Sequence, residues 1–278
     1  MRVTVCELPH EPAALAAAWA ALCEHTRANR SQLVLLPELA MVEPVWESER
    51  FDFGRWSAVE TLSDIQLRRL PSLAADFVVG TRPSGRRGRR LNQGYLWAAA
   101  GAAGLQPLRS KCFLPEERGT WEATWFEKGD PEFPAFHAGP VSFGLNICTE
   151  LWALETYASY AAQGVELVLS PRATSLATTS KWLALGAVAA MRSGAFSLSS
   201  NRVDATGACG GRAWIIDPEG DVLAITAGSE PFATRDIDLT KAAKAKESYP
   251  RDVFRRSGSE NGTGAAAAVS PEGSRTGR

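Results

Sequence analysis

The segment Gly144-Leu-Asn-Ile-Cys148-Thr-Glu150-Leu-Trp152 is the stretch on which the interpretation of this chain depends. It overlaps the end of an apolar run, residues 141–147, that is typical of a buried strand, and it places one cysteine where that strand ends. A cysteine there can be held rigidly and still face a cleft, as a nucleophile must. Because a lone cysteine is more often a small buried hydrophobic residue, the choice between the two interpretations depends on the rest of the chain.

The composition fits one layered α/β domain. The chain has 278 residues, 45% of them hydrophobic, and a net charge of -1, so a large core can form and no global charge favours nucleic acid or an anionic membrane. Five cysteines without CxxC spacing and three histidines predict neither a disulfide framework nor a metal site. Because we find no signal peptide and no run long enough to span a membrane, we expect a cytoplasmic protein.

Strand-like and helix-like segments alternate along the chain. Strands are expected at residues 2–8, 32–36, 76–80, 91–100, 141–147, 165–170 and 195–200, with a hairpin formed by 212–216 and 221–225. Helices are expected at residues 12–27, 58–73, 152–163 and 179–193. This order favours mixed sheets with helices on their outer faces.

Two segments outside these elements are treated as solvated. The arginine-rich loop at residues 82–90 lacks interleaved aromatic residues, so we interpret it as a hairpin turn and not as a nucleic-acid patch. Residues 257–278 are rich in Gly, Ser, Ala and Glu and have little to bury, so we expect a disordered tail. A single domain is therefore predicted over residues 1–256.

Two further strand ends carry reactive side chains. Glu38 follows Leu33-Val-Leu-Leu-Pro37, and Lys111 lies in Leu108-Arg-Ser-Lys111-Cys-Phe-Leu-Pro115. A cysteine nucleophile needs a base, and no histidine lies at a comparable strand end. Glu38 can accept the thiol proton if the site excludes water, and Lys111 can supply positive charge to a thiolate or an oxyanion. Each signal alone is weak, but the three together are chemically consistent.

With these motifs the chain resembles the nitrilase, or carbon–nitrogen hydrolase, superfamily, which is marked by a Glu-Lys-Cys triad in this order. The matching patterns are Leu-Pro-Glu38, Lys111-x-x-Leu-Pro and Gly-x-x-Ile-Cys148-x-Glu. The resemblance continues in three further segments and covers about residues 1–255: Glu122-Ala-Thr-Trp-Phe126-Glu-Lys-Gly129-Asp130, Asn201-Arg202 and Ile215-Ile-Asp-Pro-Glu-Gly220. Several motifs in a fixed order are more specific than any one of them.

The resemblance implies an α/β fold of four layers, an αββα sandwich in which two mixed sheets face each other, and assembly into a homodimer or a higher homo-oligomer. It also implies that Cys148 attacks the carbon of an amide or nitrile to give a thioester, while Glu38 transfers protons. Lys111 and the backbone N–H of Thr149 would stabilise the oxyanion, and Glu122 would orient Lys111. Neither a cofactor nor a metal would be needed.

Several alternatives remain open at this point. Glu150 either lines the site or anchors its loop, and anchoring is favoured because another carboxylate near Glu38 would compete for charge. Arg172, at the next strand end, either binds a substrate carboxylate or forms a salt bridge with an acid such as Glu150.

The favoured activity is cleavage of a small carboxamide or N-carbamoyl compound, releasing ammonia or an amine. The alternatives are a true nitrilase, a non-catalytic scaffold and a partner-dependent subunit that donates ammonia. Thr149 stands where the family's nitrilases usually have tryptophan, which disfavours the first of these alternatives.

Overall fold

The computed structural model describes residues 1–85, 88–100 and 104–254. Its first sheet has the strand order β5-β4-β3-β2-β1. The strands span Arg2–Leu8 (β1), Leu33–Leu35 (β2), Phe77–Ser84 (β3), Leu91–Ala98 (β4) and Leu105–Ser110 (β5). The pairs β1–β2 and β2–β3 are parallel, whereas β3–β4 and β4–β5 are antiparallel, so this sheet is mixed.

The second sheet is also mixed. Parallel pairs join β9 to β10 and β10 to β11, and antiparallel pairs join β8 to β9, β11 to β12 and β12 to β13. Its strands span Phe136–Ala138 (β8), Val141–Leu145 (β9), Leu167–Arg172 (β10), Phe196–Arg202 (β11), Trp214–Ile216 (β12) and Val222–Ile225 (β13). The expected hairpin is confirmed as β12–β13, in which the N–H of Gly220 closes the turn by donating to Asp217 O.

Strand β1 joins the two sheets at one edge. Its residues Arg2 to Cys6 pair with β14 (Phe232–Asp236), and its last two residues, Glu7 and Leu8, pair in parallel with β11. The hydrogen-bonded path is therefore continuous, although the two sheets pack face to face elsewhere. The core between the sheets contains apolar side chains from both, among them Val5, Leu33, Val79, Leu145 and Leu198.

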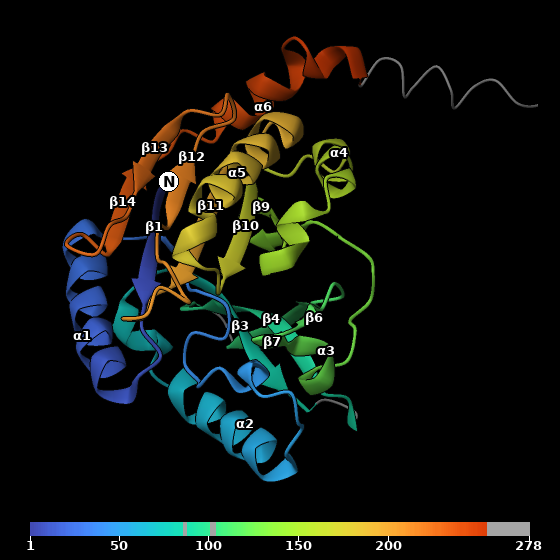
Figure 1. Ribbon diagram of the computed structural model, residues 1–278. Helices are drawn as coiled ribbons and strands as arrows, with labels where there is room; N and C mark the ends of the chain where they lie inside the picture. The colour runs from blue at the N-terminus through green and yellow to red at the C-terminus, as the bar shows by residue number, and fades with distance from the viewer. Residues whose placement is uncertain (86–87, 101–103, 255–278) are drawn as a thin grey trace, which may run out of the picture.

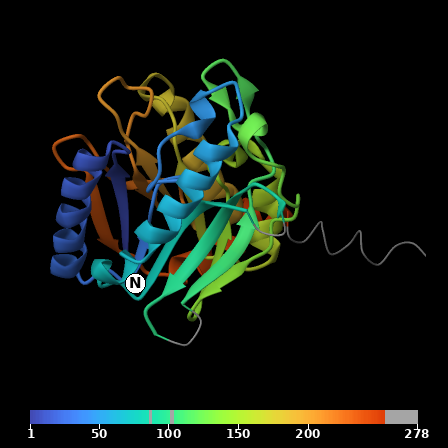
Figure 2. The same ribbon diagram turned by 90° about the horizontal axis from the view of Figure 1, so that it is seen from below.

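Helices cover the two outer faces. Helix α1 (Pro12–Asn29) and the 3-10 turn η2 (Leu70–Leu73) pack on the outside of the first sheet, and α4 (Glu155–Ala162) and α5 (Thr179–Ser193) pack on the outside of the second. Figure 1 shows α1 beside β1 and α5 beside β10 and β11. In Figure 2 the light-blue α2 (Phe53–Leu67) crosses the teal strands of the first sheet. The expected αββα sandwich is thus confirmed.

Short elements complete the described chain. They are the 3-10 turns η1 (Val45–Glu47), η4 (Cys148–Trp152) and η5 (Leu176–Thr178), the small hairpin of β6 (Glu116–Glu117) and β7 (Thr120–Trp121), and the helices α3 (Glu122–Trp125) and α6 (Thr240–Glu247). Strands β8 and β14 and helix α6 are among the elements that were not expected from the sequence.

Two predicted helices have other boundaries. The helix expected at residues 58–73 begins at Phe53, where Asp52 caps it by accepting the N–H of Arg55, and it ends at Leu67. Residues 70–73 form a separate 3-10 turn that contains Pro71, which cannot donate a helical hydrogen bond. In the second case, Trp152 belongs to η4, and α4 begins only at Glu155.

The arginine-rich loop is shorter than expected, because β3 extends to Ser84 and pairs there with Leu91. Residues 86–87 of that loop lie outside the described residues, as does the tail predicted at residues 257–278. No helix within residues 1–85, 88–100 and 104–254 has the length and apolar character needed to cross a bilayer.

Candidate active site

The three predicted catalytic side chains follow strands of different sheets. Glu38 comes three residues after β2, and Lys111 directly follows β5, both in the first sheet. Cys148 comes three residues after β9 in the second sheet. Within electrostatic range of the Cys148 thiol lie Glu38, Lys111 and Glu122, so these residues share one interior region. Their exposed fractions are 5% or less.

Lys111 is the centre of this region. Its Nζ donates to Glu38 Oε1 at 2.9 Å and to Glu122 Oε1 and Oε2 at 2.8 and 2.6 Å. Burial alone would lower the pKa of Lys111, but the carboxylates of Glu122 and Glu38 outweigh burial and hold the pKa well above the ordinary lysine value. Lys111 is therefore a permanent cation between two carboxyl groups.

Glu38 is fixed by neighbours on both sides. Its N–H donates to Arg172 O at 3.2 Å, and the following residue, Leu39, has a left-handed φ of 47° and donates its N–H to Thr81 Oγ1. The buried Arg202 donates to Leu39 O and Val42 O, both at 2.9 Å. These contacts fix the loop that follows Glu38.

The Glu38 carboxylate is held asymmetrically. Asn92 Nδ2 donates to Glu38 Oε1 at 2.8 Å, and this is the same oxygen that Lys111 contacts. No hydrogen bond to Oε2 is found among the residues that the structure describes. The geometry thus distinguishes one anchored oxygen from one oxygen available as a base.

Cys148 begins the 3-10 turn η4 with a left-handed φ of 50°. A non-glycine residue with positive φ is uncommon and is often found at functional sites. Burial raises the pKa of the Cys148 thiol, the Glu38 carboxylate raises it further, and Lys111 and the N–H of Ala173 lower it. Because burial prevails, the thiol is protonated at neutral pH and requires a base during attack.

Thr149 is the second residue of the same 3-10 turn and is half-buried. The first N–H groups of a helical turn have no partner within the turn. Within the described part of the chain, no hydrogen bond from the Thr149 N–H is found. This donor is therefore available for the oxyanion role expected of it.

Glu122 begins the short helix α3, and its backbone carbonyl accepts the N–H of Phe126 at 2.7 Å. The burial of its carboxyl raises the pKa of Glu122 to about 7, although Lys111 acts in the opposite direction. Two nearby glutamates, Glu116 and Glu117, lie exposed in strand β6, where Glu116 accepts a hydrogen bond from Thr124. Among these three glutamates, Glu122 is the one that contacts Lys111.

Glu150 anchors the loop around the nucleophile. Its carboxylate accepts the N–H of Ile147 at 2.8 Å and that of Cys112 at 2.7 Å, and it forms a buried ion pair with Arg109. These bonds agree with the favoured anchoring interpretation. The alternative salt bridge between Glu150 and Arg172 is wrong, because Glu150 pairs with Arg109 of β5.

Arg172 ends strand β10 and is 1% exposed. Its nitrogens donate to Ser199 Oγ, Thr174 Oγ1 and Arg212 O, and its guanidinium lies 4.0 Å from the ring centroid of Trp214. No acid within the described ranges pairs with it, and burial lowers the pKa of Arg172 to about 9. Binding of a substrate carboxylate stays a prediction.

Sequence reasoning missed two residues of this region, Asn92 and Arg109. Each had a signal. Asparagine is depleted in strands, so Asn92 near the start of a predicted buried strand was unusual. Arg109 lies two residues before Lys111, so alternation along the strand places both on one face.

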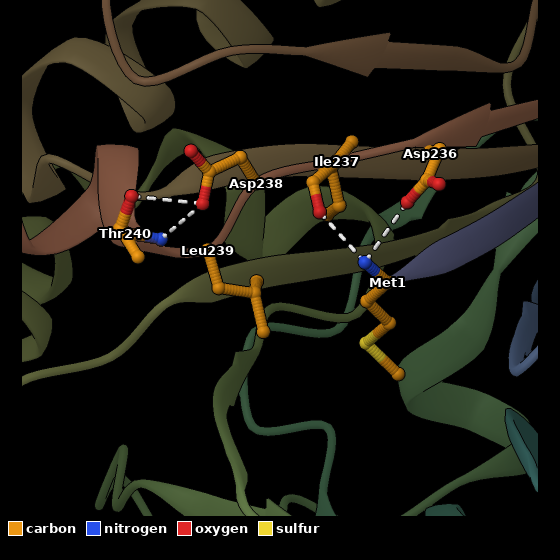
Figure 3. Close-up of a pocket in the computed structure, with 6 residues that line it drawn as sticks. All are labelled: Met1, Asp236, Ile237, Asp238, Leu239 and Thr240. Atoms are coloured by element: carbon orange, nitrogen blue, oxygen red, sulfur yellow. Dashed lines mark hydrogen bonds and ion pairs between the residues drawn. The ribbon is translucent and has the colours of Figure 1, made fainter.

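A surface hollow elsewhere shares none of these residues (Figure 3). It is lined by Met1, Asp236, Ile237, Asp238, Leu239 and Thr240. The amino terminus donates to Asp236 Oδ1 at 3.1 Å and to Ile237 O at 2.7 Å, so its charge is already paired.

Among the described residues, no group of three or more His, Cys, Asp or Glu side chains is arranged to hold a metal ion.

Comparisons with known proteins concern the family and the fold of this chain. The sequence profile of the carbon-nitrogen hydrolase family matches residues 2–247. A search of curated protein sequences found no match. A carbon-nitrogen hydrolase from Helicobacter pylori is structurally similar, with a TM-score of 0.79 and 19% identity over 94% of this chain and 97% of the other.

Two further solved structures have similar folds. An amidase from Nesterenkonia sp. AN1, a variant with acrylamide added at its active-site cysteine, matches with a TM-score of 0.70 and 20% identity over 92% of this chain and 99% of that one. A superfamily protein from Xanthomonas campestris with an arsenic adduct in its active site matches with a TM-score of 0.69 and 19% identity, over 91% and 96%.

Proposed function

Because this chain belongs to the carbon-nitrogen hydrolase family, we propose that it hydrolyses the C–N bond of a small carboxamide or N-carbamoyl compound, with Cys148 as the nucleophile. The observation that supports this most strongly is the buried Lys111, hydrogen-bonded to both Glu38 and Glu122 beside the Cys148 thiol. The similar Nesterenkonia amidase, modified at its active-site cysteine, supports cysteine chemistry in this fold.

The first half of the reaction forms a thioester. Glu38 takes the thiol proton as Cys148 Sγ bonds to the substrate carbon, and the carbonyl oxygen becomes an oxyanion. The Thr149 N–H donates to that oxyanion, and the Lys111 charge stabilises it. When the intermediate collapses, the C–N bond breaks, and Glu38 passes its proton to the leaving nitrogen, which departs as ammonia or an amine.

The second half consumes water. Glu38 accepts a proton from a water molecule as the water oxygen bonds to the thioester carbon. Collapse of this intermediate breaks the C–S bond, and the proton on Glu38 returns to Cys148 Sγ. The products are the acid and the free enzyme, so the cycle needs no other reactant.

A substrate panel tests the proposal. Purified protein is incubated with amides, N-carbamoyl compounds and nitriles, and ammonia or amine release is measured beside Cys148→Ala. Cys23→Ala, in a buried cysteine of α1, is the matched control and should keep full activity. We expect release from an amide or carbamoyl compound and loss of at least about 1,000-fold in Cys148→Ala.

The other outcomes separate the alternatives. Release from nitriles but not from amides would establish a nitrilase and reject the proposed substrate class. Turnover of glutamine only in the presence of a synthetase would indicate an ammonia-donating subunit. The absence of turnover, together with no alkylation of Cys148 by iodoacetamide, would favour a non-catalytic scaffold.

A further inference from the structure

We propose that Arg109 and Glu150 form a positioning pair that holds the lysine segment and the nucleophile segment in register; this role rests on the function proposed above. Neither side chain needs to touch the substrate. The pair would act through the backbone on either side of Lys111 and Cys148, which belong to different sheets.

The Glu150 carboxylate is shared between the two segments. Oε2 accepts the N–H of Ile147, the residue before Cys148, at 2.8 Å. Oε1 accepts the N–H of Cys112, the residue after Lys111, at 2.7 Å. One carboxylate therefore sets the distance between the backbones that carry the cation and the nucleophile.

Arg109 fixes the carboxylate in place. Its Nη1 and Nη2 both donate to Glu150, a bidentate arrangement that defines the carboxylate plane as well as its position. Its Nε donates to Glu132 O at 3.0 Å, and its guanidinium lies 3.9 Å from the ring centroid of Phe133. The side chains of Arg109 and Glu150 are 4% and 0% exposed, so water cannot replace either partner.

The nucleophile needs such support because its backbone is in an unfavourable conformation. Cys148 has φ of 50° directly after Ile147, and Glu150 holds Ile147 on both sides, since its carboxylate accepts the Ile147 N–H and its own N–H donates to Ile147 O at 3.1 Å. Without the carboxylate, the N–H groups of Ile147 and Cys112 would lose their acceptor in a dry interior, and both segments would relax. A displacement of about 1 Å at a reacting group can cost roughly 100-fold in rate.

The test uses Glu150→Gln, which keeps the side-chain volume but can accept at only one oxygen. Arg109→Lys keeps the positive charge but loses the bidentate contact, and it serves if Glu150→Gln does not fold. Glu219→Gln, which removes the remote ion pair with Arg251, is the control. The readouts are the second-order rate constant for alkylation of Cys148 by iodoacetamide, located by mass spectrometry, and kcat and KM on the best substrate.

We expect alkylation and kcat to fall about 10- to 100-fold in the folded variants, with KM within a few-fold of the parent value and the control unchanged. A folded Glu150→Gln or Arg109→Lys protein with the parent's alkylation rate and kcat would overturn the positioning role, even if its melting temperature were lower. Alkylation needs no turnover, so it tests the pair even if the panel shows no hydrolysis, an outcome that counts against the proposed function alone.

Discussion

Lys111 Nζ donates to three carboxylate oxygens, which is the full number of N–H groups on an ammonium. It therefore has no N–H left for a substrate oxyanion while Glu122 and Glu38 stay in place. In the proposed mechanism its contribution is its charge, and the direct hydrogen bond comes from Thr149. At the scale of single residues, the lysine organises the two carboxyl groups of the site.

Glu122 should make folding stability depend on pH in a defined direction. Its pKa is raised to about 7 in the folded protein, above the ordinary glutamate value of about 4.3 in an unfolded chain. Between these values the folded state binds more protons, so this group's contribution to the free energy of unfolding falls as pH rises from about 4 to about 7 and is constant outside that window. Glu122→Gln removes the contribution.

Urea unfolding at several pH values between 5 and 8 provides the measurement. The free energy of unfolding of the parent protein, relative to that of Glu122→Gln, should decrease as pH rises. A difference that stays level or increases with pH would contradict the raised pKa.

Arg172 is predicted to bind a substrate carboxylate. Arg172→Ala should raise KM for carboxylate-bearing amides by about 10-fold or more, because a charge-assisted hydrogen bond contributes about 1.5–3 kcal/mol, and it should affect neutral amides of similar size less. Steady-state kinetics on matched pairs of substrates decides this. An equal increase in KM for carboxylate-bearing and neutral amides would leave Arg172 only the packing role indicated by its bonds to Ser199 and Thr174.

At the scale of elements, the segment after β5 shows why one glycine of the motif is needed. The N–H of Gly129 donates to Lys111 O at 2.8 Å, and a Cβ at this position would lie 2.1 Å from Ser110 O. That contact is with backbone, which cannot rotate away as a side chain can. The approach of this segment to the lysine strand therefore requires glycine.

Gly129→Ala should consequently destabilise the fold by about 1–3 kcal/mol and lower kcat, because the displaced backbone leads directly into Lys111. Chemical denaturation and ammonia release measure the two effects. Gly228→Ala is the matched control, since a Cβ there meets no atom within 4 Å, and it should change stability by less than about 0.5 kcal/mol. Unchanged kcat in a destabilised Gly129→Ala would argue against the link to Lys111.

These elements also show how far the sequence can be interpreted. Apolar runs before Glu38 and Cys148 were sufficient to predict β2 and β9, because each of these strands is short and buried. Strand β5, before Lys111, was not in the predicted set, because Gln106 and Pro107 are exposed and interrupt the apolar pattern. The partner of Glu150 was not predictable, because Arg109 lies 41 residues away and only the strand order brings it close. Helix boundaries were missed where a local cap or a proline, Asp52 or Pro71, outweighed the hydrophobic pattern.

At the scale of the whole molecule, the candidate site lies across the junction of the two sheets. Glu38 and Lys111 follow strands of the first sheet, whereas Cys148 follows a strand of the second. The distance between base and nucleophile therefore depends on how the sheets pack on each other. The core between the sheets is then part of the site's geometry even where it lies far from the triad.

Two leucine-to-alanine substitutions separate the effect of sheet packing on the site from general destabilisation. Leu198, on β11, lies in the core between the sheets, and Leu22, on α1, lies under the outer helix layer; both are fully buried. Leu198→Ala and Leu22→Ala should each cost about 2–5 kcal/mol of folding stability. Measured well below the melting temperature, kcat should fall in Leu198→Ala and stay near the parent value in Leu22→Ala. Equal kcat in both variants would mean that sheet packing does not set the geometry of the site.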